Sequence, residues 1–373
     1  MKKTGPRRSL AIACLCFLMI VLPVSGIGAA QDMDARLLDA LVMDASTTLC
    51  GEPVPIQSKE VVERFEKEML LLLGDRSQVI LWLKRSARYF PFIESALIRH
   101  GLPEDIKYLA IAESALRVHA GSRKGAMGVW QLMPQTARKY GLTVNKDIDE
   151  RRNPYLSTEA ALAYLVDLHA RFDSWSLSLA AYNMGEEGLE AQILEQGNRD
   201  YYRLYLSLET QRFIFRILAI QKIFKTPQAY GFHLEADDFY SPHVTASVRI
   251  TAVEDLPIHL IARAAKTDFK TIKDFNPEVR GYYLTSGTRQ LAIPTGGREG
   301  FQERLANYIK VDKKNHPRRT YVVKSGDSLS GIAKRFEVPL AALLIWNRMN
   351  TRTVIHPGQR LVIAPAKEGQ ADD

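Results

Sequence analysis

Cysteine is scarce in this chain of 373 residues, which contains three. Two of them, Cys14 and Cys16, lie in an apolar N-terminal run, so Cys50 alone would remain after removal of that run. This scarcity excludes a disulfide framework and a cysteine metal site, and it leaves Cys50 as a structural or unpaired thiol. The eight histidines are scattered without a metal-ligand spacing such as HExxH, so we expect no metal and no cofactor.

Long apolar runs are also missing. The run 10–24 is shorter than the roughly 20 residues that a membrane-spanning helix needs, and no other stretch could span a bilayer. Four basic residues precede the run, and Gly28, Ala29 and Ala30 follow it as a small-residue cleavage site. Residues 1–30 are therefore predicted to be a secretory signal, and an uncleaved membrane anchor is the alternative. The mature protein would be exported, and membrane association remains possible although the sequence does not indicate it.

A strong excess of charge is absent as well. The formal net charge is +8, and loss of the four basic residues of the signal would leave about +4. Such a mild charge suits an anionic polymer such as cell wall but does not argue for nucleic acid. A hydrophobic content of 46% with 25% charged residues is typical of a globular protein, and the length allows two or three domains.

The pattern along the chain predicts an α+β multidomain protein. From about residue 34 to 225 the pattern is helical throughout, with Ser157 expected to cap one helix and Thr210–Phe224 expected in the core. We divide this part into a helical segment, 31–90, which packs on a helical domain, 91–225. Two linkers, 226–245 and 297–319, and a polar tail, 366–373, are expected outside the folded units.

An internal repeat follows the helical part. Its two copies, 246–296 and 320–365, each show a β-branched strand, two short helices and a final apolar strand, which predicts two small βααβ modules. Asn276 aligns with Asn347 after the second helix of each copy, and Ile293-Pro294 aligns with Ala364-Pro365 or nearby.

One charged residue, Glu113, falls on the apolar side of a predicted helix in the helical domain. A helix predicted to start at Pro103 places Ile106, Leu109, Leu116 and Glu113 on one apolar stripe. Burying a carboxylate costs several kcal/mol unless it is paired or protonated. Glu113 is therefore either a structural residue paired with an arginine, such as Arg117 or Arg138, or a functional carboxyl.

Several motifs make the helical region similar to the soluble lytic transglycosylase domain of the goose-type lysozyme superfamily. They are Glu113-Ser114, "GAMGVWQLMPQTA" from Gly125, "DERRNPYLSTEAALAYL" from Asp149, "LAAYNMG" from Leu179 and "SLET" from Ser207. The pattern resembles most closely the membrane-bound transglycosylase D type. The resemblance implies a lysozyme-like all-α domain, export to the periplasm or envelope of a bacterium, and peptidoglycan glycan strands as the partner. We expect a monomer.

The resemblance also implies roles for individual residues. Glu113 would be the catalytic acid and base, and a raised pKa would let it hold a proton near neutral pH. Glycosidases usually need two carboxylates, and no second one is evident in the matching blocks, so the substrate's own C6 hydroxyl would attack and give a 1,6-anhydro end. Gly125 and Gly128 would let a glycan approach the backbone. The expected substrate-binding residues are Ser114, Gln131, Met133, Tyr182 and Asn183. Of these, Ser114 would orient the carboxyl, Tyr182 would hydrogen-bond Glu113, and Asn183 would bind the N-acetyl group. Trp130 would add an apolar face.

The second repeat copy resembles a LysM module, on "VKSGDSLSGIAKRF", "WNRM" and "HPGQRLVI". This implies binding of N-acetylglucosamine in a shallow groove between Gly326, Asp327, Ser328 and Leu329 on one side and Ile355 and Pro357 on the other. Asn347 is interpreted as a structural turn residue. The first copy has Val253-Glu254-Asp255-Leu256 in place of that turn and resembles a degenerate LysM module. A hydrolytic muramidase or chitinase on the same fold, and a non-catalytic wall-binding scaffold, are the alternative functions.

Overall fold

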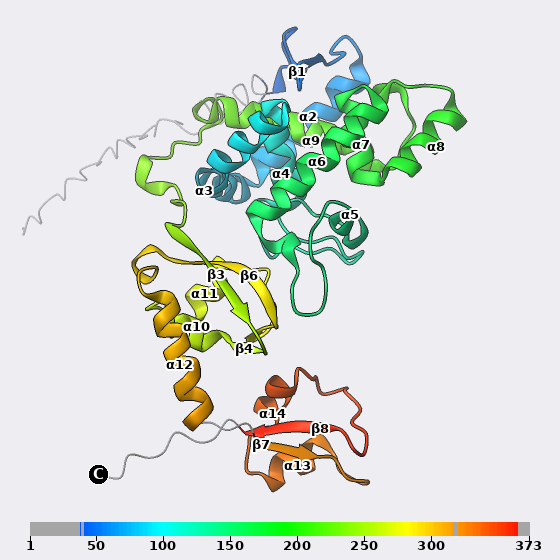
Figure 1. Ribbon diagram of the computed structural model, residues 1–373. Coiled ribbons are helices and arrows are strands. Elements are labelled where there is room, and N and C mark those ends of the chain that lie inside the picture. Colours follow the sequence, from blue (N-terminus) through cyan, green and yellow to red (C-terminus); the bar gives the residue numbers. More distant parts are fainter. Residues whose placement is uncertain (1–37, 39–40, 316–318, 365–373) are drawn as a thin grey trace, which may run out of the picture. The chain divides into compact units, whose positions relative to one another are not determined.

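The computed structural model describes Leu38 and residues 41–315 and 319–364 (Figure 1). The predicted signal, 1–30, and the predicted tail, 366–373, lie outside these residues. Within the described part, no helix combines the length and the apolar character that a bilayer span requires.

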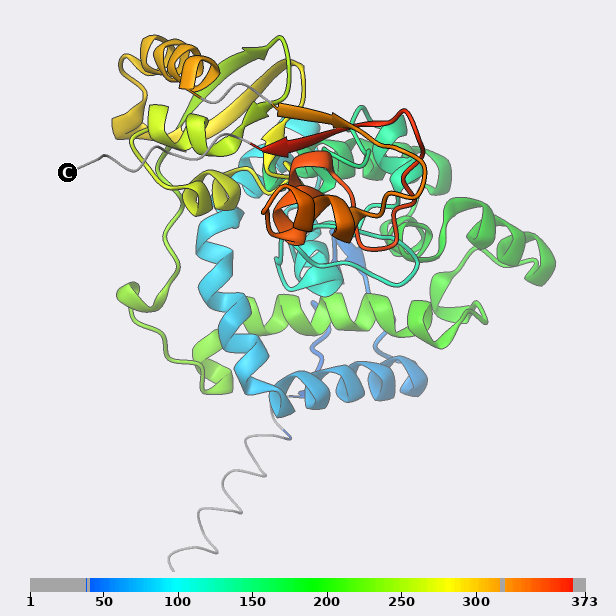
Figure 2. The same cartoon turned by 90° about the horizontal axis from the view of Figure 1, so that it is seen from below.

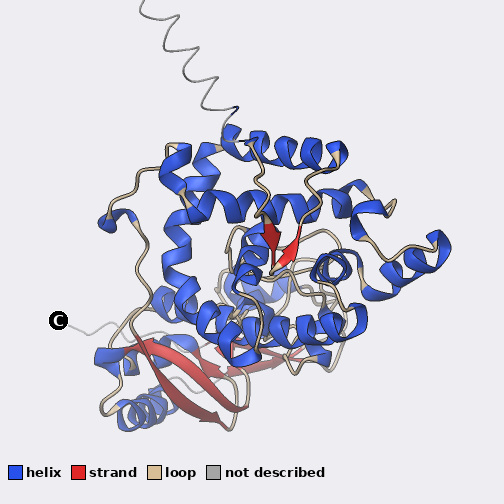
Figure 3. Cartoon of the chain, turned by 90° about the horizontal axis from the view of Figure 1, so that it is seen from above, coloured by secondary structure: helices blue, strands red, loops and turns tan. Residues whose placement is uncertain are grey.

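The N-terminal two thirds of the described chain are almost entirely helical (Figure 3). The helices are α2 (Lys59–Gly74), α3 (Arg76–His100), α4 (Lys107–Ser114), α5 (Pro134–Lys139), α6 (Pro154–Phe172), α7 (Trp175–Met184), α8 (Glu186–Gln196) and α9 (Leu208–Lys225). Helix α3 runs across the expected boundary at residue 90. A two-stranded antiparallel ladder, β1 (Thr48–Leu49) with β2 (Glu52–Pro53), lies in the part from residue 34 onward where the pattern was expected to be helical throughout. Cys50 and Gly51 between these strands both have positive φ angles, which end any helix there.

Helix α9 forms the centre of the helical domain. Helices α2, α4 and α7 all pack against it, and α2 and α9 lie side by side (Figure 2). Most of its apolar side chains are buried, as the sequence predicted; among them are Phe213, Ile214, Phe215, Leu218 and Ile220. Ser207 begins the helix by accepting a hydrogen bond from the Thr210 amide at 3.3 Å.

The start of α6 differs from the prediction. The helix begins at Pro154 and not after Ser157, because Asn153 caps it by accepting hydrogen bonds from the amides of Tyr155 and Leu156. Proline at the first helical position after an N-cap asparagine is a stronger start signal than an interior serine. Ser157 is buried inside the helix.

The only cysteine of the described part lies in the tight turn between β1 and β2. Cys50 has a φ of 54°, and its amide donates a hydrogen bond to the Asp105 carboxylate at 2.8 Å. Burial, assisted by the negative charge of Asp105, raises the pKa of the Cys50 thiol far above its ordinary value. The thiol is therefore a structural group.

The segment 226–245 packs against α3 and is not an extended linker. Two short 3₁₀ turns, η4 (Pro227–Tyr230) and η5 (Ala236–Asp238), interrupt it. Arg76 of α3 donates to the carbonyl oxygens of Tyr230 and Gly231, and the Tyr240 amide donates to the Lys84 carbonyl at 2.9 Å. These contacts hold the connector against the helical domain.

Both repeat copies fold as βααβ units, as predicted. The first contains β3 (Thr245–Ala252), β4 (Leu256–Pro257), α10 (Ile258–Ala264), α11 (Phe269–Phe275), β5 (Tyr283–Leu284) and β6 (Gly287–Pro294), with β3 antiparallel to β6. The second contains β7 (Arg319–Val322), α13 (Leu329–Arg335), α14 (Leu340–Asn347) and β8 (Arg360–Ala364), with β7 antiparallel to β8.

The aligned asparagines make the same three hydrogen bonds in both copies. The Asn276 amide group donates to the Ile272 and Ala292 carbonyls, and its oxygen accepts from the Ala292 amide. Asn347 repeats this with Leu343 and Val362. Each asparagine thus ties the end of the second helix to the last strand, which confirms the alignment and the structural role of Asn347.

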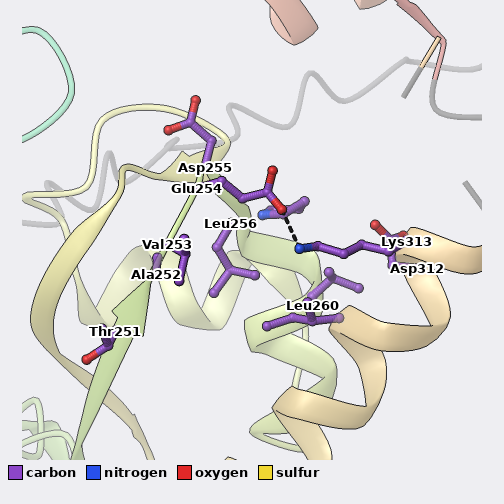
Figure 4. Close-up of a pocket in the computed structure, with 11 residues that line it drawn as sticks. Thr251, Ala252, Val253, Glu254, Asp255, Leu256, Leu260, Asp312 and Lys313 are labelled. Atoms are coloured by element: carbon purple, nitrogen blue, oxygen red, sulfur yellow. Dashed lines mark ion pairs between the residues drawn. The ribbon is translucent and has the colours of Figure 1, made fainter. Parts of the chain in front are cut away.

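The segment 297–319 was predicted to be a linker, and this was wrong for most of it. Residues Phe301–Asn315 form helix α12, because Phe301 and Leu305 supply apolar side chains that are buried in the core of the first module. We therefore define the first module as residues 245–315 and the second module as 319–364. Helix α12 also walls a cavity of about 380 Å³ beside the turn after β3, where Glu254 pairs with Lys313 at 2.6 Å (Figure 4).

Candidate active site

Glu113 lies in the last turn of α4, not in the middle of a longer helix as the apolar stripe predicted. Helix α4 ends at Ser114, because Ala115 and Leu116 both adopt positive φ angles of 56° and 59°. A non-glycine residue rarely adopts this conformation, and two in succession reverse the chain sharply. Arg85 donates to the carbonyl oxygen of Ala115, and Arg117 donates to that of Ser114, so the end of the helix is capped by arginine side chains.

The pKa of the Glu113 carboxyl is raised to about 8. Burial is the largest cause, and the negative charge of Glu209 adds to it, whereas the positive charge of Arg216 acts in the opposite direction. The C-terminal end of a helix dipole also disfavours an anion at this position. Glu113 therefore carries a proton at neutral pH.

A structural ion pair does not account for Glu113. Among the described residues, no hydrogen bond or ion pair to its carboxyl is formed. The two arginines considered as partners are used elsewhere: Arg117 on the Ser114 carbonyl, and Arg138 on the Val144 carbonyl at 2.9 Å.

A cleft of about 470 Å³ lies within electrostatic reach of Glu113. Glu113 does not itself line the cleft, but the lining residue Glu209 raises its pKa, and Glu113 in turn raises the pKa of the lining residue Tyr182. The lining side chains come from the loop before α5 and from α5, α6, α7, α8 and α9; they include Lys124, Gln131, Met133, Thr136, Tyr164, Tyr182, Asn183, Met184, Glu186, Ser207, Glu209 and Thr210. Four of the five predicted substrate-binding residues are thus brought together.

The side-chain amides of Gln131 and Asn183 each have one polar atom that makes no hydrogen bond within the described part of the chain. The Gln131 amide nitrogen donates to the carbonyls of Ala120 and Gly128, so its oxygen remains an acceptor. The Asn183 oxygen accepts from the Thr210 hydroxyl at 2.9 Å, so its nitrogen remains a donor. Met133 adds an apolar surface that is 42% exposed. The cleft thus offers an acceptor, a donor and an apolar wall.

Two predicted contacts to the Glu113 carboxyl are not made. The Tyr182 hydroxyl donates to the Trp130 carbonyl at 2.7 Å and not to Glu113. The Ser114 hydroxyl is buried and donates to the Val129 carbonyl at 2.7 Å, which excludes the predicted substrate contact. Both hydroxyls instead fix the loop that carries Gln131, because a carbonyl oxygen in that loop is the nearest acceptor.

Close packing within the protein requires glycine at position 128. Its φ is +83°, and a Cβ atom built on it would lie 1.8 Å from the Arg151 carbonyl oxygen. Arg151 is buried, pairs with Asp149 through two hydrogen bonds, and donates to the carbonyls of Gly125 and Leu132. Arg151 of the "DERR" motif therefore holds the backbone of the loop 120–132 in place. Trp130 is fully buried and donates to the Thr158 hydroxyl at 2.8 Å, so it belongs to the core.

Sequence reasoning missed two acidic residues of the cleft. Glu209 belongs to the "SLET" block, so the inference that no second carboxylate falls in the matching blocks was wrong. Glu209 lies in the first turn of α9, and it was not singled out from the sequence. Glu186 accepts a hydrogen bond from the Tyr164 hydroxyl at 2.6 Å, and no motif indicated this pair.

The second module has a groove of about 380 Å³. Four of the six predicted glycan-binding residues line it, namely Asp327, Ser328, Leu329 and Ile355, while Gly326 and Pro357 are not among the lining residues. Asp327 is engaged within the turn, since its carboxylate accepts from the Tyr321 hydroxyl and the Lys324 amide. Ser328 caps α13 through the Gly331 amide. The remaining lining residues are Ser330, Leu340, Leu344, Thr351, Thr353 and Val354, which the sequence did not single out.

Metal ligation is not evident in the described part of the chain, where no group of three or more His, Cys, Asp or Glu side chains could hold an ion.

Two protein families match this chain, and several known proteins are similar to it. The family described as Transglycosylase SLT domain matches residues 90–205, and the LysM domain family matches residues 321–364. The chain is 31% identical to membrane-bound lytic murein transglycosylase D of Escherichia coli (strain K12) over 322 residues, which cover 83% of this chain and 70% of that protein. It is 33% identical over 135 residues to the peptidoglycan transglycosylase gp16 of Escherichia phage T7, covering 32% of this chain and 10% of that protein.

Among solved structures, the 70 kDa soluble lytic transglycosylase of Escherichia coli is similar over 58% of this chain and 37% of that one, with 15% identity and a TM-score of 0.34. The lysozyme-like helical domain and the two family matches define an enzyme of the lytic transglycosylase class with a LysM module. Given the extent of the similarity to transglycosylase D, the chain belongs to the family of membrane-bound lytic murein transglycosylase D.

Proposed function

We propose that the enzyme cleaves the β-1,4 bond between N-acetylmuramic acid and N-acetylglucosamine in peptidoglycan, with Glu113 as both acid and base. The strongest support is a carboxyl whose pKa is raised to about 8 and which interacts electrostatically with Glu209 and Tyr182, two residues that line a cleft with sugar-binding chemistry. A general acid must hold its proton until the leaving group needs it.

In the proposed reaction, the Glu113 proton moves to the oxygen that leaves C1 of N-acetylmuramic acid as the glycosidic bond breaks. The N-acetyl group of the substrate stabilises the positive charge that develops at C1. The C6 hydroxyl of the same sugar then attacks C1, and the Glu113 carboxylate takes up its proton. The product is a 1,6-anhydro end, no water is consumed, and Glu113 returns to its protonated state.

The cleft residues have roles that match this substrate. The Asn183 amide nitrogen can donate to the N-acetyl carbonyl, and the Gln131 oxygen can accept from a sugar hydroxyl or the acetamido N–H. Met133 offers an apolar contact to a sugar face. Tyr182 acts through the Trp130 carbonyl, since its hydrogen bond holds the loop that presents Gln131.

Hydrolysis is the second candidate, and Glu209 favours it because an additional carboxylate could activate a water molecule. Product mass separates the two reactions. Digestion of purified sacculi, followed by mass spectrometry of the muropeptides, should give ends lighter by one water than those of a hydrolase. Products of full hydrolytic mass would overturn the transglycosylase mechanism, and no cleavage by the pure protein would favour the scaffold.

The second module would hold the enzyme on the wall by binding N-acetylglucosamine in its groove. The groove combines apolar side chains with the hydroxyls of Ser328, Ser330, Thr351 and Thr353, which suits a sugar. A weak module on the same chain raises the effective concentration of the catalytic domain at a polymer. This partner and the family similarity support an exported protein of the bacterial envelope.

We expect Val354→Asp to weaken retention of the full-length protein on insoluble peptidoglycan about tenfold. Val354 lines the groove and is 71% exposed, so a charge there places an unpaired anion against the sugar without disturbing the core. A pull-down in an inactive Glu113→Gln background measures this without digestion. Val322→Asp is the matched control, because Val322 is exposed on β7 and does not line the groove. Equal retention of the two variants would show that this groove is not the binding site.

A further inference from the structure

A buried glutamate lies outside the residues matched by the transglycosylase family. Glu68 of α2 is 1% exposed, yet it is a charged side chain on a helix that otherwise buries apolar groups. Its carboxylate accepts a hydrogen bond from Arg212 at 2.5 Å and pairs with Arg216 at 3.6 Å. Both arginines lie on α9, one helical turn apart, and each is about a third exposed.

These residues connect Glu68 to the active site. Glu209, Arg212 and Arg216 follow each other on α9 at spacings of three and four, which places them on one face of the helix. Helix α9 packs against both α2 and α4. Arg216 is thus paired with Glu68 while its positive charge also acts on the Glu113 carboxyl.

Among the groups that act on Glu113, Arg216 is the cation, and its charge lowers the pKa of the Glu113 carboxyl. Glu209 of α9 acts on Glu113 in the opposite sense, and Tyr182 of α7 is neutral and bonded to a carbonyl oxygen. Arg85 of α3 and Arg117 beyond α4 are held on carbonyl oxygens at the end of the helix.

The charged groups at the start of α4 pair with each other or with neighbouring elements, among them Asp105 with Lys225 of α9 at 4.0 Å. Lys107 binds Glu94 and Glu104 there, and Asp105 accepts from the Cys50 amide. None of them is among the groups that act on Glu113.

We propose that Glu68 is a positioning residue for the reaction: its carboxylate holds Arg216 and offsets the positive charge that this arginine would otherwise present to Glu113. This rests on the proposed function, in which Glu113 is the general acid. An arginine without this partner would be free to turn toward Glu113, favour the carboxylate and remove the acid from the reaction. The N-terminal helix α2 thereby contributes to catalysis without touching substrate.

The test is the pH dependence of kcat/KM on peptidoglycan, measured with the full-length protein. The alkaline limb reports loss of the Glu113 proton in the free enzyme and should lie near pH 8. In Glu68→Gln the alkaline limb should move to a pH about one unit lower. At pH values above the wild-type limb, cleavage should therefore be about tenfold slower, whereas in mild acid the rate should change little. Glu68→Gln with Arg216→Gln should move the limb back up, to the wild-type position or above it, because the arginine charge that favours the carboxylate is gone.

Arg212→Gln is the matched control. It removes a stronger contact to the same carboxylate, but Arg212 is not among the groups that act on Glu113, so the limb should stay in place. If Glu68→Gln lowered kcat/KM equally at every pH and left the alkaline limb in place, Glu68 would have only a structural role. If Glu68→Gln does not fold, Arg216→Gln alone should move the limb to higher pH, and an unmoved limb there overturns the proposal. Normal activity of Glu113→Gln would instead be a failure of the proposed function.

Discussion

Glu113→Gln is expected to reduce cleavage of peptidoglycan by at least about 10²-fold at every pH, because glutamine keeps the size of the side chain but cannot donate and retrieve a proton. Binding to the wall should be unchanged, since the groove of the second module is separate from Glu113. Release of soluble muropeptides from purified sacculi measures the loss. Glu63→Gln, an exposed residue of α2, is the matched control and should retain full activity.

The same substitution should stabilise the fold in a pH-dependent way. The pKa of Glu113 is raised from 4.5 to about 8, so the folded protein keeps a proton that the unfolded chain releases. Stability is therefore lost as pH rises between these two values, and glutamine removes that loss. We expect the melting temperature of Glu113→Gln to exceed that of the wild type by more at about pH 9 than at about pH 5. An equal difference at both values would mean that Glu113 does not titrate abnormally.

Gly128→Ala is expected to lower cleavage by about 10²-fold and to reduce the melting temperature, although Glu113 remains in place. The new methyl group would lie 1.8 Å from the Arg151 carbonyl, so the loop must move away from its clamp. Displacement of a substrate-positioning loop by about 1 Å can cost two orders of magnitude in rate. Initial rates on sacculi and thermal unfolding measure the two effects.

Gly125→Ala separates the clash from the backbone conformation. Gly125 also has a positive φ, +96°, but no atom lies within 4 Å of the Cβ position. It should therefore show only the cost of the left-handed backbone, roughly 1–2 kcal/mol of stability. If the two alanine variants lost equal activity, contact with Arg151 would not be the reason for glycine at position 128.

The sequence predicted the fold where local patterns and packing agree. Helical periodicity located α9 as a core helix, and the repeat predicted two βααβ units down to the equivalent positions of Asn276 and Asn347. The prediction of a linker after residue 296 was wrong because the polar composition of this segment masked its apolar side. Phe301 and Leu305 are spaced as on one face of a helix, but polar and charged residues of both signs surround them, and only the packed module shows that they belong to its core.

The site was predictable in its residues but less so in its contacts. The motifs brought Gln131, Met133, Tyr182 and Asn183 to one cleft, yet they could not tell which acceptor each hydroxyl reaches. Ser114 and Tyr182 both donate to carbonyl oxygens of the loop 128–132, whose backbone path depends on the buried Arg151. Glu68 and its arginines lie more than 140 residues apart, so no local pattern connects them.

The partly buried thiol of Cys50, whose pKa is strongly raised, makes the protein well suited to site-specific labelling. Thiol reagents react with the thiolate, and Cys50 is held in its protonated form by burial and by the Asp105 carboxylate. A single cysteine introduced on an exposed surface position would therefore be the preferred target of a fluorophore or spin label in a chain that starts after residue 30, with Cys50 left in place. Pairs of such labels, one on the helical domain and one on a module, would allow distances between the two to be followed while the enzyme works on intact sacculi.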